Sequence, residues 1–323
     1  MLAGVRQQNV HEVYHIHRNH RYSQLTRYSS SSRLITPPRL EDEVYPYRRV
    51  WPSIIIELSG IFGVAFVLYV ASGFLGITLP ESLQQPTNIL IALLPAVLWL
   101  ATSYWRERRV PEPRRGILGV FIISGLVANA IALPLINAIN PGEWLSLSPL
   151  VSRIIGNMVT FGVIHEFSKY IILRYTIWPQ GIRERPDAIA YSAAATIGYV
   201  TVINLAYVLS ANVSSDAAAL NVFATTGTHI AAGMVISYGL AQSHFNPRSF
   251  LLTPFTLIMA AAIHGISITM RANFTNSGFF LGIAGTRPLF GLIIAVVLVV
   301  GVLFIMAFLF NNAERQSREA DSA

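Results

Sequence analysis

The chain has 323 residues, of which 53% are hydrophobic and only 12% charged, and its formal net charge is +7. A soluble domain carries about 25% charged residues, so this composition indicates a membrane protein and excludes a disordered or collagen-like chain. The absence of cysteine excludes disulfides, thiolate zinc sites, cysteine nucleophiles and iron–sulfur clusters. All basic residues except Lys169 are arginines.

Eight apolar segments are long enough to be transmembrane helices, which need about 20 residues to cross the hydrocarbon core. They predict an all-α, polytopic membrane helix bundle. Proline within the second and third segments is compatible with this, because neighbouring helices can satisfy the freed carbonyl groups. The segments are 53–75, 88–104, 116–139, 150–177, 187–210, 219–242, 250–270 and 288–310.

The arginines are distributed unevenly among the connections. Residues 1–50 hold eight arginines and the loop between the second and third segments holds five, whereas alternate loops hold few. By the positive-inside rule both termini are cytoplasmic, which agrees with an even number of spans. We therefore expect an Arg- and His-rich cytoplasmic arm (1–50), a transmembrane domain (51–310) and a cytoplasmic tail (311–323). We expect the plasma membrane of a prokaryote as the location, and no nucleic-acid partner.

A few ionisable side chains lie inside the apolar segments, where they are costly in lipid and usually mark a functional interior. Glu57 lies one turn into the first segment, and Arg153 lies at the outer end of the fourth, where it can reach the membrane surface. His165, Glu166 and Lys169 lie in the fourth segment, His229 in the sixth and His264 in the seventh. At a rise of about 1.5 Å per residue, the three histidines occupy one depth band. We expect one buried polar site. An intrahelical Glu166–Lys169 ion pair that only fixes packing is the alternative interpretation.

Small residues flank both later histidines, and the fifth segment carries a regular row of them. Ala190, Ala194 and Gly198 recur every four residues, which predicts a smooth face for close helix contact. The same segment carries Asn204, a side chain able to donate a hydrogen bond inside the bundle.

The serial order of these features resembles the PrsW-like intramembrane proteases, relatives of the CAAX prenyl endopeptidase and Abi families. The resemblance covers about residues 150–270. Its motifs are Glu-Glu-x-x-Lys, then a helix with Gly-Phe-x-x-x-Glu-Asn, then a lone histidine, then His-x-x-x-Asp or Asn. The positions that match are Glu166, Lys169, Asn204, His229 and His264.

Three positions depart from the family pattern, so its motifs are degenerate here. His165 stands where the first Glu is expected, Ile203 stands where the second motif has Glu, and Ile268 stands where the last motif has Asp or Asn. The resemblance implies an intramembrane peptidase site at His165, Glu166, Lys169, Asn204, His229 and His264.

Two functions remain open, and a third has less support. The losses favour an inactive scaffold or accessory subunit of a membrane complex, whose partners would be other membrane subunits. The alternative is an active endopeptidase acting on a membrane-bound substrate. A transporter or channel is less favoured, because no inverted repeat is visible.

The chemistry of an active site would need a general base and a group that stabilises the oxyanion. Glu166 would be the base, with His229 and His264 positioning water, while His165 could replace the missing Glu and Asn204 could donate to an oxyanion. No cofactor is required by this scheme. Zinc is a minority hypothesis, with His165, His229 and His264 as candidate ligands beside Glu166, because no short-range motif such as His-Glu-x-x-His is present.

Overall fold

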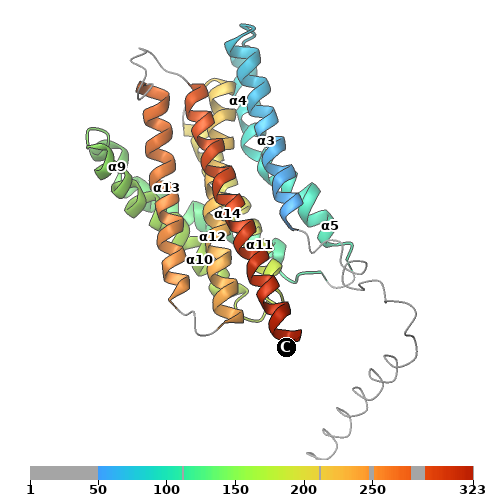
Figure 1. Cartoon of the computed structure of the whole chain (residues 1–323). Helices are drawn as coiled ribbons and strands as arrows, with labels where there is room; N and C mark the ends of the chain where they lie inside the picture. The colour runs from blue at the N-terminus through green and yellow to red at the C-terminus, as the bar shows by residue number, and fades with distance from the viewer. Residues whose placement is uncertain (1–49, 111–112, 211, 247–250, 278–287, 323) are drawn as a thin grey trace, which may run out of the picture. The chain divides into compact units, whose positions relative to one another are not determined.

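The computed structural model describes residues 50–110, 113–210, 212–246, 251–277 and 288–322. The predicted arm therefore lies outside the described residues, apart from its last residue. Within the described part the chain is helical, and the helices follow one another as drawn in Figure 1. The elements are α3 (Val50–Gly73), α4 (Glu81–Trp99), η2 (Leu100–Tyr104), α5 (Trp105–Glu107), α6 (Ile117–Val127), η3 (Ala128–Ala132), α7 (Leu133–Ile139), α8 (Pro141–Leu145), α9 (Leu150–Asn157), η4 (Met158–Gly162), α10 (Val163–Thr176), α11 (Arg185–Ser210), α12 (Ser215–Phe245), α13 (Leu252–Ser277) and α14 (Pro288–Ser322), where η marks a π-helical segment.

Seven of the predicted spans form helices that are long and apolar enough to cross a membrane. The helical bundle predicted from the sequence is thus confirmed, and the spans imply a lipid bilayer around it. They are Val50–Gly73, Glu81–Glu107, Ile117–Ile139, Arg185–Ser210, Ser215–Phe245, Leu252–Asn276 and Pro288–Ser317.

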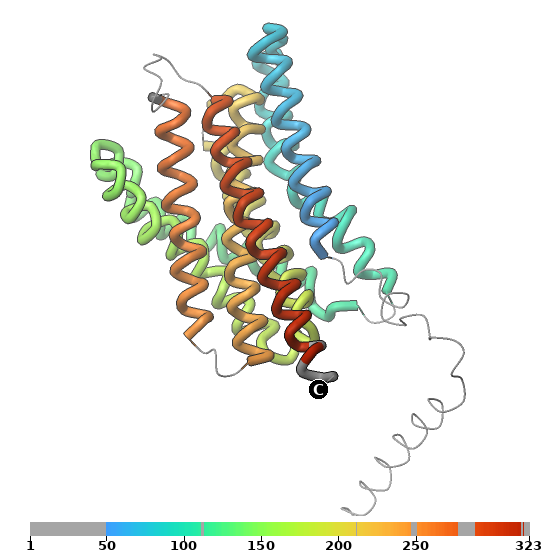
Figure 2. The backbone as a smooth tube through the Cα atoms, viewed as in Figure 1, coloured from blue at the N-terminus to red at the C-terminus, as the bar shows by residue number. Residues whose placement is uncertain are grey.

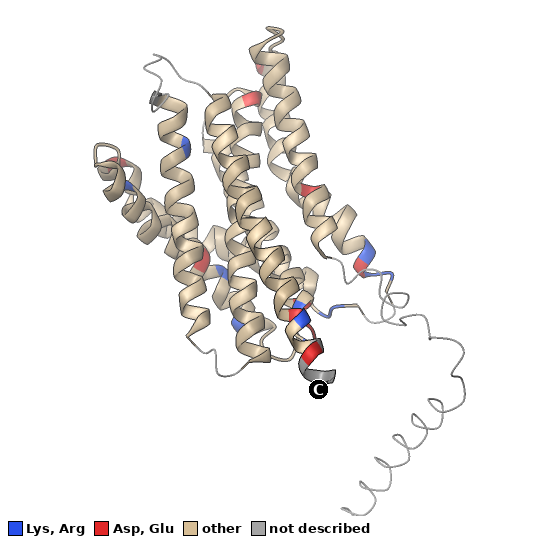
Figure 3. Cartoon of the chain, viewed as in Figure 1, with Lys and Arg blue, Asp and Glu red and all other residues tan. Residues whose placement is uncertain are grey.

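The remaining predicted span, 150–177, is helical through α9, η4 and α10 but is not among the seven apolar helices. The physical reason is its polarity, because it carries Arg153, Glu166, Lys169 and Arg174. Figure 3 shows how sparse charge is elsewhere, with long stretches of helix that hold neither acidic nor basic residues. The helix with too little apolar content is therefore the one that carries the charged part of the predicted site.

Helix α12 lies at the centre of the bundle. It packs against α3, α4, α11, α13 and α14. Of its most apolar stretch of 18 residues, 89% is buried inside the bundle. Figure 2 shows α12, α13 and α14 running side by side, and α3 and α14 both contact α12. His229, which lies in α12, is consequently held away from lipid on all sides.

Pro134 and Gly198 mark two places where the local backbone matters for the course and packing of the helices. The third span continues through Pro134, which closely follows the π-helical segment η3, and local π-helical adjustment can satisfy the backbone groups that a proline leaves free. At Gly198 of α11, an added Cβ would meet the carbonyl oxygen of Phe121 in α6. Only glycine permits this approach of α11 to α6.

A buried ion network holds the start of α11. Arg114 Nε lies 2.7 Å from Asp187 Oδ1, and Arg114 Nη1 lies 3.0 Å from Glu107 Oε2. The other oxygen of Asp187 accepts the backbone N–H groups of Arg183 and Glu184, both at 2.9 Å. Asp187 thus has a structural role at this end of the bundle.

Helix α14 continues to Ser322, so residues 311–322 of the segment predicted as a tail extend the last helix. At about 1.5 Å per residue its 35 residues exceed the thickness of a bilayer, so its final turns extend beyond the hydrocarbon core.

Candidate functional site

Four predicted side chains from three helices meet inside the bundle. Glu166 and Lys169 come from α10, His229 from α12 and His264 from α13. Glu166 Oε1 lies 2.7 Å from Lys169 Nζ and 2.7 Å from His264 Nε2, while His229 Nδ1 lies 3.9 Å from the same oxygen. The intrahelical ion pair is therefore present, but it is one part of a larger cluster.

His165 joins this cluster through its ring. The ring centroid of His165 lies 4.9 Å from that of His229 and 5.5 Å from that of His264. Its Nδ1 lies 2.9 Å from the hydroxyl of Tyr199 in α11, which fixes the orientation of the ring. Tyr199 also faces Lys169, whose Nζ is 5.9 Å from the tyrosine ring centroid.

Glycine and hydroxyl residues bring the three helices together. An added Cβ at Gly265 would meet the carbonyl oxygen of Ile154 in α9, so α13 can approach the helix of Glu166 only because residue 265 has no side chain. The hydroxyls of Thr228 and Ser267 lie 2.7 Å apart and tie α12 to α13 next to the two histidines. The π-helical segment η4 immediately precedes α10, and such segments often occur at functional sites.

The cluster is removed from solvent and lipid. The exposed fractions are 0% for Glu166, 1% for Lys169, 2% for His229 and His264, and 5% for His165. Glu166 Oε2 is also buried and has no hydrogen-bond partner. A buried carboxylate oxygen without a partner is unusual and indicates a place for a water, an ion or a substrate atom.

The donors fit a metal ion in type and spacing. One ligand atom each from Glu166, His229 and His264 can be chosen so that all three lie within 4.8 Å of one another. Two imidazoles and a carboxylate are a known ligand set for catalytic zinc. His165 is outside this group, so the set differs from the three histidines proposed from the sequence. Lys169 Nζ contacts two of the donors and would have to withdraw from them.

The other predicted residue, Asn204 of α11, contacts α12, the helix of His229. None of its described contacts is with a member of the cluster. Its Nδ2 donates to Thr226 Oγ1 at 3.1 Å, three residues before His229, and its Oδ1 is buried without a partner. Its part in the site stays a prediction.

Two features of the site escaped the sequence analysis. Tyr199 follows Gly198 and is one of the polar residues of the fifth segment, but nothing in the sequence linked its hydroxyl to His165. The Thr228–Ser267 contact also requires the pairing of α12 with α13. Glu57, a further buried carboxylate, instead accepts hydrogen bonds from Thr102 and Ser103 and takes no part in the cluster.

These observations define a class: an all-helical, polytopic membrane protein with a buried Glu–His–His group of the kind that binds metal or activates water. The sequence model described as PrsW family intramembrane metalloprotease matches residues 112–309, more than half of the chain, and the chain belongs to this family. Protease PrsW of Geobacillus kaustophilus (strain HTA426) is 20% identical over 193 residues, which cover 58% of this chain and 81% of that protein. No solved structure matches the chain.

Family membership confirms the resemblance inferred from the motifs, and it extends that resemblance beyond residues 150–270 at both ends. The bacterial origin of the relative agrees with the expected prokaryotic membrane.

Proposed function

We propose that this protein is an intramembrane endopeptidase whose hydrolytic centre is Glu166 with His229 and His264. The observation that carries the proposal is the state of the Glu166 carboxylate. Its Oε1 is held by Lys169 and His264, whereas its Oε2 is buried beside the histidines without a partner. This arrangement positions a base and leaves one oxygen available for a water molecule.

Proton movement follows from these contacts. Glu166 Oε2 takes a proton from water as the water oxygen bonds to the carbonyl carbon of the peptide. Glu166 then gives this proton to the leaving nitrogen as the C–N bond breaks, so that atoms and charge balance. The ammonium of Lys169 and the imidazole of His264 stabilise the carboxylate while it is ionised, before it takes the proton and after it gives the proton up.

His229 is suited to stabilise the oxyanion. Lys169 Nζ lies 3.4 Å from His229 Nδ1, and because an ammonium group only donates, Nδ1 accepts and the ring proton is on Nε2. That N–H can donate to the developing oxyanion. His165 is held by the Tyr199 hydroxyl against the same group of rings and positions them.

A metal ion would be held by Glu166, His229 and His264. When bound there it would polarise the carbonyl group and acidify water.

A scaffold without catalysis is the second candidate, and two observations favour it. Lys169 contacts both Glu166 Oε1 and His229, so the cluster is largely satisfied as a structural network. Two departures from the family pattern, Ile203 and Ile268, remove polar groups near the same helices.

Cleavage of transmembrane test peptides by the purified protein in liposomes distinguishes the two candidates. The wild type should cleave members of a peptide library, and Glu166→Gln should lower the rate by about 100-fold or more, the usual range for loss of a general base. Glu57→Gln is the matched control, because it alters a buried carboxylate in a different part of the bundle. Full activity of Glu166→Gln, or an inert wild type that copurifies with stoichiometric subunits, would contradict the peptidase.

A further inference from the structure

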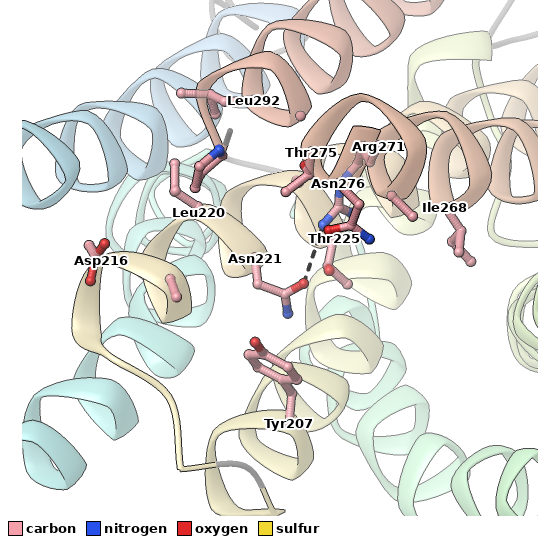
Figure 4. Close-up of a pocket in the computed structure, with 15 residues that line it drawn as sticks. Tyr207, Asp216, Leu220, Asn221, Thr225, Ile268, Arg271, Thr275, Asn276 and Leu292 are labelled. Carbon is pink, nitrogen blue, oxygen red and sulfur yellow. Dashed lines mark hydrogen bonds between the residues drawn. The ribbon is translucent and has the colours of Figure 1, made fainter. Parts of the chain in front are cut away.

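A pocket of about 620 Å³ opens beside the proposed hydrolytic centre. Thr225 of α12 and Ile268 of α13 line it, four residues from His229 and His264 respectively. Four residues correspond to a rise of about 6 Å, so about one helical turn separates these lining residues from each histidine. Figure 4 shows the side chains that line it, which also come from the end of α11 and the start of α14.

Arg271 of α13 lies in the wall of this pocket and is half-buried. Its Nη2 donates to the side-chain oxygen of Asn221 in α12 at 3.3 Å, the contact dashed in Figure 4. A guanidinium group has five N–H donors, so one neutral acceptor leaves most of them available. Among the residues that the structure describes, no carboxylate pairs with Arg271, and Asp216 lies across the pocket from it in Figure 4.

An arginine in a membrane-spanning helix is costly and normally has a partner or a ligand. The rest of the wall supplies hydrogen-bonding groups on either side of it, including Tyr207, Asn221 and Thr275. An extended peptide needs such groups, because its backbone N–H and C=O groups find no water in the bilayer. A carboxylate is the group that a guanidinium binds in bidentate fashion.

The distance to the centre specifies where this carboxylate would lie. Arg271 follows His264 by seven residues, a rise of about 10 Å along α13. An extended peptide covers about 3.3 Å per residue, so this distance corresponds to about three residues. We propose that the pocket binds the substrate segment next to the cleaved bond, and that Arg271 recognises an Asp or Glu side chain two to four residues from that bond. This inference rests on the proposed function.

The test uses the full-length protein in liposomes and a set of transmembrane test peptides in which one Asp is moved through each position around the cleavage site. Each peptide has a twin with Asn in place of Asp. The wild type should cleave the Asp peptide about 10-fold faster than its twin at positions two to four, on one side of the cleaved bond. Arg271→Gln should remove this preference while still cleaving the Asn peptides.

Arg153→Gln is the matched control. Arg153 is also half-buried in a helix of the bundle, and its Nη1 also donates to one asparagine, Asn273, at 3.1 Å. This variant should retain the full Asp preference. A preference that is equal in Arg271→Gln and the wild type overturns the proposal, as does a preference lost equally in both variants.

Peptide binding separates failure of this inference from failure of the proposed function. Fluorescent Asp and Asn peptides are titrated into the Glu166→Gln protein, with and without Arg271→Gln. In one outcome, the wild type cleaves no peptide at all, while Asp peptides bind about 10-fold more tightly than Asn peptides in an Arg271-dependent way. That result supports the proposed pocket and contradicts the proposed peptidase activity. Equal binding of both peptides overturns the pocket. Binding to phosphatidylglycerol vesicles is compared with binding to phosphatidylcholine vesicles. If Arg271 is needed for preferential binding to phosphatidylglycerol and both peptides bind equally, the pocket binds a lipid headgroup instead.

Discussion

Lys169 joins α10 to α12 through a single residue, His229. Its Nζ lies 3.4 Å from both the Nδ1 atom and the main-chain oxygen of His229, while it also pairs with Glu166 at 2.7 Å. The only lysine of the chain is therefore the cation that balances the buried carboxylate and orients the histidine beside it. Its removal should affect stability as well as chemistry.

Lys169→Met should destabilise the protein by about 3–5 kcal/mol, because it leaves the Glu166 carboxylate buried without its cation. The double variant with Glu166→Gln should recover much of this loss, since neither charge then remains. Thermal unfolding in detergent measures both changes. A single variant as stable as the wild type would show that the pair contributes nothing to the fold.

Tyr199→Phe should lower the turnover number about five- to tenfold. It removes the hydroxyl that holds His165 Nδ1, and a hydrogen bond contributes about 1 kcal/mol. Tyr191→Phe is the control, because the Tyr191 hydroxyl instead donates to the main-chain oxygen of Arg115. If both variants lose turnover to the same extent, the Tyr199 hydroxyl has no specific role in catalysis.

Gly265→Ala should destabilise the bundle by about 1–3 kcal/mol, since the new Cβ meets the carbonyl oxygen of Ile154 and pushes α13 from α9. Gly119→Ala changes a helical glycine with no heavy atom within 4 Å of its added Cβ. It should be neutral or stabilising, because alanine favours the helix. The urea or thermal midpoints of the two variants give the comparison, and an equal response would argue against close packing at residue 265.

Zinc held by this cluster should appear as about one equivalent in metal analysis of the purified protein. His229→Gln should lose it, because three donors are the usual minimum for a catalytic zinc site. His165→Gln should keep it, because His165 is outside the group of donors that lie within 4.8 Å. Zinc that depends equally on both histidines would contradict the assigned ligand set. A metal-free wild type with full activity would assign water activation to Glu166 alone.

Both chain ends should be cytoplasmic if 150–176 spans the membrane as the eighth helix. The helix holds the charged part of the cluster in the middle of the bundle, which is why it is not apolar enough by composition alone. Reporter proteins fused before residue 1 and after residue 323 should both be active only on the cytoplasmic side. Reporters on opposite sides would indicate seven spans.

Much of the fold was predictable from local properties of the chain. Apolar length predicted the helices, and the cost of a charge in lipid identified Glu166, Lys169, His229 and His264 before any contact was known. The same reasoning missed Arg271, because its position near the end of a segment resembles that of an arginine whose head group reaches the membrane surface. It also could not distinguish Glu57, a buried carboxylate with only hydroxyl partners, from a member of the site.

The sequence by itself thus determined the class of protein, the approximate course of its spans, its family resemblance and the ionisable residues of the buried cluster. Tertiary structure alone decided that Glu166 lies between Lys169 and His264, that Tyr199 holds His165, and that a pocket with Arg271 opens one turn away. The reason is physical. Hydropathy and spacing act within one helix, whereas these contacts depend on which faces of α10, α11, α12 and α13 pack together, and residues far apart in the chain set that packing.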